Sequence, residues 1–505
     1  MKKKITVFLL LTLGLGTISI ATINLQSATP VDASSPYYVQ HGANASLSPL
    51  DDQKIQLDSQ TFTYDMTSGA TKATMSVPWT SVYKLTDTDT TARNVTFALP
   101  YVTLNSNITA KTPSYPSLSY TVAGGTTTLT PSAIHEITPD TGLDGFYGTD
   151  ADPVAIEKTY KAAQALLPSD TLSLYHYNYT LALKHENSEV TLNCASTTDS
   201  IGVYTIPYGI NGSNVNFYGS TYPTLETTGT TTATFNFYAT KKLVPQQITY
   251  AYWSEGSYAK DTETFTDTFE PEETITFLAY CEKWSETYSY PVSLFKDNVA
   301  YQLHTEIADQ STPRYYGVTP HLPKEGYDES GCTFLDLLYT VPLTGGTSFT
   351  LTQEGSVSSG GDAHYDPYVF SFYCTLTVRG NYATYKAATI QVETGSAYIL
   401  NSTFKKSGSS TYTYTDPQTS TVSTPVVIQY CTSASPSHRS VFDGFTNFLT
   451  ILFSFVLPCL GLIFLAHSPM YVGVYIIVGI SLLLGLIAMT VVLLVENSSK
   501  KKDKK

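Results

Sequence analysis

The chain has 505 residues, of which 42% are hydrophobic and 14% are charged. This length predicts about two to three domains between the apolar terminal segments, and the low charge excludes an intrinsically disordered chain. Residues 34–442 contain 20 Lys and Arg against 38 Asp and Glu, a net charge of about −18 without a basic cluster, which argues against nucleic acid as a partner.

An export signal is predicted at residues 1–33. Lys2, Lys3 and Lys4 precede an apolar stretch from residue 5 to about residue 23, as in secretory signals. The small-x-small pattern at 31–33 suits cleavage before Ser34. Because the apolar stretch is long, an uncleaved anchor is the alternative.

The exported part is expected to consist of strands. The chain is rich in Thr and contains 39 Tyr, and both residue types suit a pleated, half-buried surface. Apolar residues alternate with polar ones over 75–79, 95–99, 175–183, 190–194 and 370–378. The predicted fold class is therefore mainly β, with two or more antiparallel β-sandwich (Ig-like) modules, one short helix and a C-terminal α-helical membrane hairpin.

The short helix is predicted at residues 153–167. Asp152 can cap it, Pro153 suits its first turn, and Pro168 ends it. Glu157 and Lys161 add a favourable pair four residues apart. We expect this helix to pack across a sheet edge or to join two sheets, and to have a structural role.

The predicted division of the exported chain has three parts. One or more N-terminal β-sandwich modules occupy 34–243 and include the helix, a second module occupies 244–401, and 402–442 forms a Ser/Thr-rich strand and stalk. The boundary is placed near 241–247. Similar stretches at 179–183 and 190–192 (YTLAL, VTL) and at 339–343 and 349–351 (YTVPL, FTL) suggest two related modules.

Two membrane segments are predicted at 445–466 and 470–495, followed by a Lys-rich tail at 496–505. Neither segment contains a charged side chain, and each is long enough to span about 30 Å of hydrocarbon as a helix. The intervening Pro469 favours a hairpin. A hairpin would leave the tail outside, against the usual position of basic residues, so a single span preceded by an interfacial segment is the alternative.

Five cysteines are candidates for disulfides in the exported part, because an oxidising compartment permits them. They are Cys194, Cys281, Cys332, Cys374 and Cys431. Since five thiols cannot all pair, at least one stays free or pairs with another chain. Cys194 and Cys374 are in phase with apolar strand positions, so burial as unpaired core residues is the alternative for both.

A calcium site is predicted at Asp140, Asp144 and Asp150, which are interleaved with glycines in a loop. The alternative is a solvated loop. Asp362, His364 and Asp366 form a second cluster in which two carboxylates flank an imidazole. Because no established catalytic motif accompanies either cluster, no catalytic residue is assigned.

One segment resembles a known group of proteins. Residues 77–87 (VPWTSVYKLTD) followed by 94–100 (NVTFALP) form a strand-turn-strand pattern. The pattern is similar to one in uncharacterised membrane-anchored surface proteins of Gram-positive bacteria. The resemblance implies an envelope location and β-sandwich modules, and it transfers no active residue.

The leading functional hypothesis is a non-enzymatic cell-surface protein, structural or adhesive, held in the cell membrane with most of its chain extracytoplasmic. Its expected partners are the membrane and envelope glycans or surface proteins. One alternative is an exported hydrolase that acts on envelope or extracellular glycans with carboxylates from the two acidic clusters. The other is an accessory subunit of an envelope membrane complex.

Overall fold

The computed structural model of this chain describes residues 42–43, 47–50, 54–67, 76–137, 152–185, 188–195, 200–207, 215–216, 224–227, 231–254, 257–308, 315–320, 332–362, 365–376, 378–416 and 425–438. Over these ranges the protein is mainly β, with several antiparallel sheets and few helices, which confirms the predicted fold class at this level. The expected signal at 1–33, membrane segments at 445–466 and 470–495 and tail at 496–505 lie outside the described residues. No helix within the described ranges is long and apolar enough to cross a membrane.

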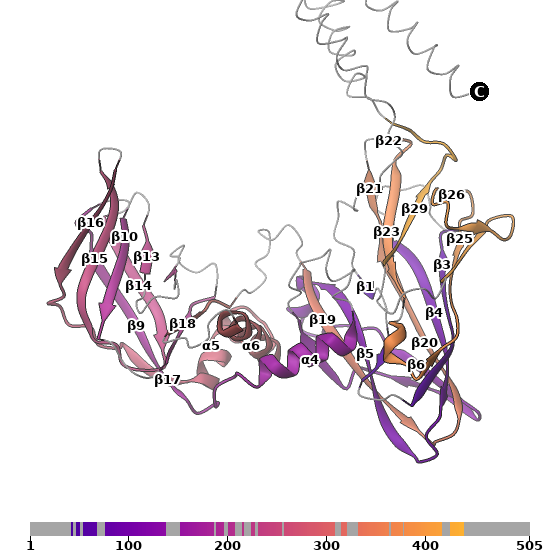
Figure 1. Ribbon diagram of the computed structural model, residues 1–505, viewed down its shortest axis with the longest axis horizontal. Coiled ribbons are helices and arrows are strands. Elements are labelled where there is room, and N and C mark those ends of the chain that lie inside the picture. Colours follow the sequence, from indigo (N-terminus) through magenta and orange to yellow (C-terminus); the bar gives the residue numbers. More distant parts are fainter. Residues whose placement is uncertain are drawn as a thin grey trace, which may run out of the picture.

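A large lobe contains two principal sheets (Figure 1). In order of paired neighbours, the wide sheet contains β27 (Lys405–Lys406), β28 (Thr411–Thr415), β25 (Ala388–Glu393), β3 (Ile55–Asp65), β4 (Ser76–Asp87), β20 (Ser348–Ser358), β6 (Leu118–Val122) and β7 (Gly125–Leu129), with β24 (Thr384–Tyr385) beside β3. The facing sheet contains β1 (Gly42–Ala43), β5 (Arg93–Leu104), β19 (Cys332–Leu343) and β8 (Ala133–Glu136), with β2 (Ser48–Pro49) beside β5.

Two smaller sheets extend the large lobe. One contains β21 (Gly360–Asp362), β23 (Val369–Thr375), β29 (Pro425–Cys431) and β26 (Tyr398–Ile399), and the other pairs β22 (Tyr365–Asp366) with β30 (Ser437–His438). Helices of the large lobe are short: α2 (Asn105–Ile108) and the 3-10 turn η2 (Arg379–Asn381). A contact between tilted rings joins these parts, since the Tyr64 and Phe372 centroids lie 4.8 Å apart with an interplanar angle of 51°.

A small lobe lies at the other end of the molecule (Figure 1). Its helix-side sheet contains β17 (Glu273–Thr276), β9 (Ser173–Ala182), β14 (Thr232–Ala239), β11 (Ile201–Thr205) and β18 (Tyr315–Val318). Its outer sheet contains β12 (Val215–Asn216), β13 (Thr224–Glu226), β10 (Ser188–Cys194), β15 (Pro245–Ser254) and β16 (Ser257–Thr264). Between the lobes lies a helical layer of α4 (Pro153–Gln164), α5 (Phe277–Thr287) and α6 (Val292–Ala308).

Side-chain alternation produces the cores. In β4 the side chains of Val77, Trp79 and Leu85 are buried with a period of two, as a strand with one wet face requires. Across the large-lobe core, Phe97 of β5 meets Phe349 of β20 with ring centroids 6.4 Å apart. A separate apolar cluster lies between the two sheets of the small lobe.

Strand pairing divides the chain differently from the predicted consecutive modules. The strand β5 pairs along its whole length with β19, from Arg93 opposite Leu343 to Leu104 opposite Cys332. The wide sheet likewise joins β4 to β20. The large lobe therefore combines both ends of the described chain, and the small lobe is inserted between β8 and β19. The expected boundary at 241–247 falls inside the small lobe, between β14 and β15.

The predicted helix is confirmed as α4. Asp152 is its N-cap and accepts a hydrogen bond of 3.0 Å from the Val154 backbone N–H, and Pro153 occupies the first turn. Glu157 and Lys161 form the expected ion pair, at 3.4 Å. The helix ends at Gln164, three residues earlier than predicted.

The expectation of one short helix was too low, because α5 and α6 also form. In α5 the Thr276 hydroxyl accepts a hydrogen bond of 3.1 Å from the Ala279 N–H as N-cap. Phe277, Tyr280 and Trp284 of α5 are buried with helical spacing. Their aromatic composition also suits strands, and this concealed the period.

The two similar stretches noted in the sequence have the same local arrangement. At 179–183 and 190–192 the chain passes from β9 in the helix-side sheet to β10 in the outer sheet. At 339–343 and 349–351 it passes from β19 in the facing sheet to β20 in the wide sheet. In both places consecutive strands belong to different sheets and do not form a hairpin.

Candidate functional site

The predicted calcium ligands Asp140, Asp144 and Asp150 lie outside the described residues, so the calcium site stays a prediction. Asp152, next to them in sequence, has a structural role. Besides capping α4, its Oδ1 atom accepts a hydrogen bond of 2.7 Å from Asn381 Nδ2. Within the described ranges, no group of three or more His, Cys, Asp or Glu side chains could hold a metal ion.

The second predicted cluster is only partly described. Asp362 belongs to β21 and pairs with Val369, whereas Asp366 belongs to β22 and pairs with Ser437. The two residues therefore lie in different sheets. His364 is outside the described residues.

Four of the five cysteine candidates are free, buried thiols: Cys194, Cys281, Cys374 and Cys431. Burial raises the pKa of Cys194, Cys281 and Cys374 to about 12 in each case. The alternative of unpaired core residues is thus the arrangement found for Cys194 and Cys374. Cys332 is the first residue of β19, opposite Leu104.

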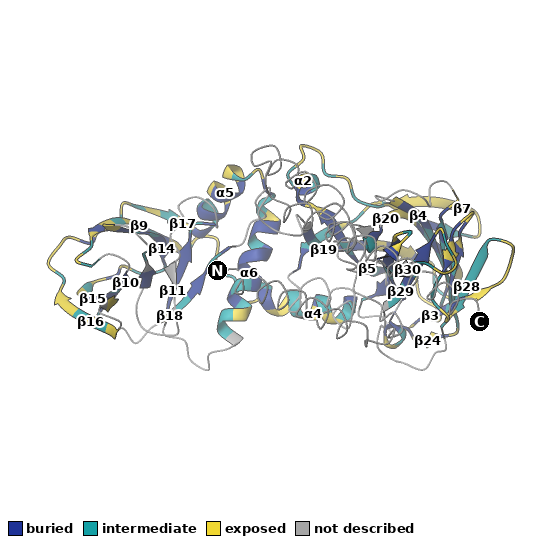
Figure 2. Ribbon diagram, turned by 90° about the horizontal axis from the view of Figure 1, so that it is seen from above, coloured by how far each residue is buried: buried dark blue, intermediate teal, exposed yellow. Residues whose placement is uncertain are grey.

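The end of the β15–β16 hairpin carries an exposed pair of aromatic side chains. Trp253 lies opposite Tyr258, next to the closing pair of Ser254 and Ser257. The ring centroids are 5.9 Å apart with an interplanar angle of 71°. Trp253 is 73% exposed and Tyr258 is 58% exposed. Figure 2 shows β16 as largely exposed at the far end of the small lobe. We call these two residues the aromatic tip.

The alternation of side chains between the two faces of β15 explains why Trp253 faces solvent. Ile248 and Tyr250 alternate with period two and are buried in the small-lobe core. Trp253 is out of phase with them and belongs to the opposite face of the strand. Trp253 was not among the residues predicted from the sequence, although its position out of phase with Ile248 and Tyr250 was a readable signal.

Contacts on the core side hold the hairpin next to the aromatic tip. The Tyr252 ring stacks on His185 with centroids 3.6 Å apart and an interplanar angle of 15°. His185 Nε2 lies 3.0 Å from Asp261 Oδ2, and this contact is the main reason why the pKa of Asp261 is lowered. Because the neighbouring residues are fixed, the aromatic tip can present its rings without a large loss of entropy on binding.

Charged groups of both signs neighbour the aromatic tip. In the strand register, Ala251 lies between Glu189 of β10 and Lys260 of β16. Partial burial and the nearby Glu189 carboxylate raise the pKa of Tyr258. The two ring faces and the hydroxyl of the aromatic tip therefore lie near a carboxylate and an ammonium group.

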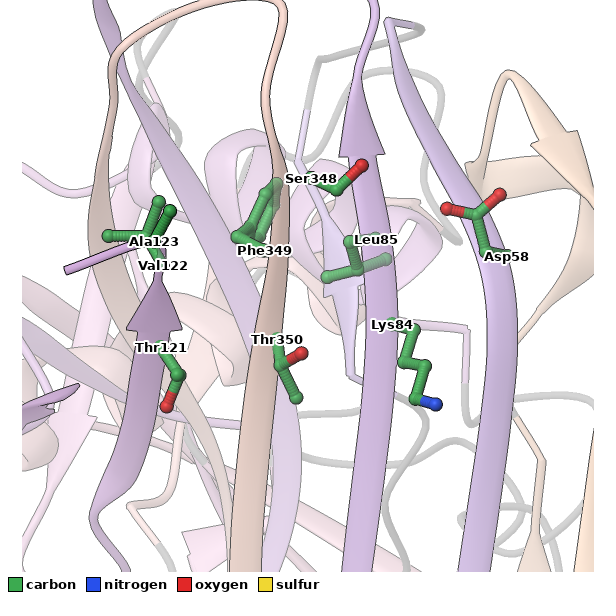
Figure 3. Close-up of a pocket in the computed structure, with 9 residues that line it drawn as sticks. All are labelled: Asp58, Lys84, Leu85, Thr121, Val122, Ala123, Ser348, Phe349 and Thr350. Atoms are coloured by element: carbon green, nitrogen blue, oxygen red, sulfur yellow. The ribbon is translucent and has the colours of Figure 1, made fainter. Parts of the chain in front are cut away.

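A shallow hollow of about 410 Å³ lies on the wide sheet (Figure 3). Thr121 of β6 and Lys84 of β4 both lie opposite Thr350 of β20, so the three side chains form a row across neighbouring strands. Asp58 completes this side of the hollow from β3. The hollow is open, and its lining is mixed, because Val122, Ala123 and Phe349 also contribute to it.

Asp58 occupies a β-bulge, and its carboxylate is already engaged. It accepts hydrogen bonds from Gln56 Nε2 at 2.6 Å, Thr86 Oγ1 at 2.7 Å and Lys386 Nζ at 2.5 Å. Burial opposes ionisation, but these donors prevail and lower the pKa of Asp58. Asp58 is the single carboxylate of this hollow, so the lining lacks the acid pair that glycoside hydrolysis needs.

A second hollow, of about 560 Å³, lies between the helical layer and the large lobe and has charged walls. Lys54 pairs with Asp89 at 2.5 Å, Arg93 lies 3.5 Å from Asp89, and Lys161 pairs with Glu157 at 3.4 Å. Each carboxylate of this lining thus has a cationic neighbour. The arrangement neutralises charge and does not resemble a general acid facing a general base.

Comparison with known proteins does not identify a family. No protein-family model and no curated protein sequence matches the chain. Among solved structures, one match is a "putative nutrient binding protein" from Legionella pneumophila, with 8% sequence identity over 79% of this chain and 72% of that chain. Its TM-score is 0.26, which is too low to indicate a common fold.

Proposed function

We propose that this chain is a non-enzymatic, adhesive surface protein that binds its partner through the aromatic tip. The observation that carries the proposal is the exposure of Trp253 and Tyr258 together at the end of a braced hairpin. Trp and Tyr are the residues most enriched at binding hot spots, because they offer large, rigid contact area with a polar handle. Large aromatic side chains elsewhere in the described chain are mostly buried.

The proposal includes an extracytoplasmic location and attachment to a membrane. Support comes from the basic and apolar residues of 1–33, the long apolar runs at 445–466 and 470–495, and the acidic balance of the residues between them. In each lobe, two sheets share an apolar core, which supports β-sandwich modules of Ig-like type. The expected partner is a component of the envelope, either a glycan or a surface protein.

Binding of the full-length chain to intact cells and to wall fractions tests this function. Truncation of a central Trp or Tyr costs about 2 kcal/mol or more at a hot spot, which corresponds to roughly thirtyfold in affinity. We expect Trp253→Ala with Tyr258→Ala to weaken binding by at least this factor. The matched control is Tyr398→Ala, since Tyr398 is 42% exposed on the large lobe and should not contribute.

Treatment of the cells separates the two partner classes. Loss of binding after protease digestion identifies a protein, and loss after glycan hydrolysis identifies a glycan. Equal binding by the double variant and the wild-type chain would refute the role of the aromatic tip. Recovery of no partner from cells or wall fractions would refute adhesion.

A further inference from the structure

A buried layer of acidic side chains lies where the helical layer meets the facing sheet. It contains Glu136 of β8, Glu157 of α4, Asp297 of α6 and Asp336 of β19, which are 6%, 7%, 4% and 0% exposed. We call these four residues the carboxyl layer. They come from four separate elements, and the proposed binding function uses none of them. Burial of an ionised carboxylate without a partner costs several kcal/mol, so this arrangement requires a physical account.

Asp336 is the extreme member. Its neighbours Leu335 and Leu337 face the large-lobe core, and strand alternation directs Asp336 to the opposite side, toward the helices. In the register it lies between His135 of β8 and Pro100 of β5. Neither carboxyl oxygen makes a hydrogen bond of normal geometry. Burial, reinforced by the charge of Glu157, raises the pKa of Asp336 well above its usual value, although the Leu99 backbone opposes the shift.

Glu136 and Asp297 are linked through the Glu136 backbone N–H, and each side chain has its own set of donors. The Asp297 carboxylate accepts hydrogen bonds from the Glu136 backbone N–H at 3.0 Å, Tyr160 Oη at 3.0 Å and Gln164 Nε2 at 2.7 Å. Burial nevertheless raises the pKa of Asp297 to about 6. These bonds tie α6 to α4 and to β8.

The side chain of Glu136 has fewer donors. It accepts hydrogen bonds from Tyr290 Oη at 2.7 Å and from Asn298 Nδ2 at 3.3 Å. Burial is the main cause that raises its pKa to about 8, and the charge of Asp297 adds to the shift. Protonated Glu136 therefore suits this position better than the anion does.

The remaining titratable groups around the layer do not compensate Asp336. The His135 ring stacks on Tyr160 with centroids 3.7 Å apart, and its Nδ1 lies 3.3 Å from Glu157 Oε2. Lys161 reaches Glu157 from the solvent side, and its side chain is 59% exposed. On α6, Tyr301 packs with Tyr160 against the same sheet and adds no positive charge.

We propose that the carboxyl layer is a proton-operated latch: with protons on Asp336 and Glu136 it holds α4 and α6 against β19 and β8, and loss of these protons loosens that contact. The small lobe reaches the large lobe through these helices (Figure 1), so the latch controls how firmly the two lobes are joined. A small apolar cluster joins Tyr160 of α4 and Tyr301 of α6 to Val102 and Phe334 of the facing sheet, so opening would expose part of a shared core.

The direction of the pH effect follows from proton binding. In a solvated, open state Asp and Glu have pKa values near 4. Between about pH 4 and pH 8 the closed state thus retains protons that the open state releases. Opening therefore becomes more favourable as the pH rises through this interval, by about tenfold per pH unit for each proton released. The latch is closed in acid and loosens toward mildly alkaline pH.

Hydrogen exchange of the full-length protein in detergent micelles, measured from pH 5 to pH 8 and corrected for intrinsic rates, tests the latch. In the wild type, protection of amides in α4 and α6 should fall steeply as the pH rises, whereas amides at the centre of β4 and β20 should keep theirs. Asp336→Asn removes one titrating group. The opening equilibrium of this variant should therefore change less with pH than that of the wild type, by a factor of about ten for each pH unit. Glu136→Gln should reduce this pH dependence separately, and Glu270→Gln, an exposed site, should leave it unchanged.

The pH dependence of amide protection in α4 and α6 distinguishes a latch from a purely structural role. A structural role would change protection equally at every pH in Asp336→Asn, whereas the latch predicts a change in slope. If Asp336→Asn does not fold, Glu136→Gln carries the same test. Protection of α4 and α6 that is independent of pH in the wild type, or an unchanged slope in the folded variants, would overturn the proposal.

Discussion

The turn between β4 and β5 contains an ion pair whose removal should destabilise the large lobe. The Asp87 carboxylate is fully buried, and Arg93 Nη1 lies 2.8 Å from its Oδ1 and 2.9 Å from its Oδ2. The Asp89 backbone N–H donates a further hydrogen bond of 3.0 Å to the same carboxylate. Because β4 belongs to the wide sheet and β5 to the facing sheet, this pair stabilises the point where the chain crosses between them. The perturbation is Arg93→Met, which keeps an apolar stem and removes the charge.

The size of the effect follows from burial. Removing one partner of a fully buried pair costs about 3–5 kcal/mol, because the other charge is left uncompensated. The Arg93 side chain is 21% exposed, and the Asp89 N–H still serves Asp87, so the cost should be smaller. We expect Arg93→Met to lower the free energy of unfolding by about 2–3 kcal/mol. Asp87→Asn should cost about 1–2 kcal/mol, since the amide oxygen can still accept the backbone hydrogen bond.

Urea unfolding at pH 7 provides the assay, with both single variants and the double variant in one cycle. The coupling energy should be about 1–2 kcal/mol, and the dependence on urea concentration should stay unchanged. Lys242→Ala is the control, because the Lys242–Glu270 pair is exposed on both sides and should contribute less than about 0.5 kcal/mol. A loss below about 0.5 kcal/mol in Arg93→Met, or additive effects in the cycle, would refute the reasoning.

Two further predictions concern packing and thiol reactivity. Gly355→Ala should lower the free energy of unfolding in urea by about 1–3 kcal/mol, because an added Cβ would lie 2.7 Å from the Trp79 ring. Gly125→Ala is the control, since a Cβ at this position meets nothing within 4 Å. Equal stability of the two variants would contradict the packing argument. Cys194, Cys281 and Cys374 should resist a thiol reagent at pH 8 in the native protein and react after unfolding, since burial raises the pKa of each to about 12. Native labelling as fast as in urea would contradict their burial.

The sequence alone determined those strands and helices that are specified by residues close together in the chain. The alternation at 75–79 predicted a strand, and β4 shows this alternation in its buried side chains. Asp152 and Pro153 predicted the start of α4 with its cap. In α5 the apolar spacing was equally local, but Tyr, Phe and Trp also favour strands, so composition obscured the period.

Tertiary structure decided which strands pair and which side chains are enclosed. The partner of β5 is β19, from the far side of the inserted small lobe, and no alternation within either strand specifies the other. Asp336 is an ordinary acidic residue in a strand until β5, β8 and the helices cover it. Trp253 was visible as out of phase, yet its exposure depends on what packs beside the hairpin. Conformational preference depends on near neighbours, whereas burial and the charge state of a carboxyl depend on groups that only the folded chain brings together.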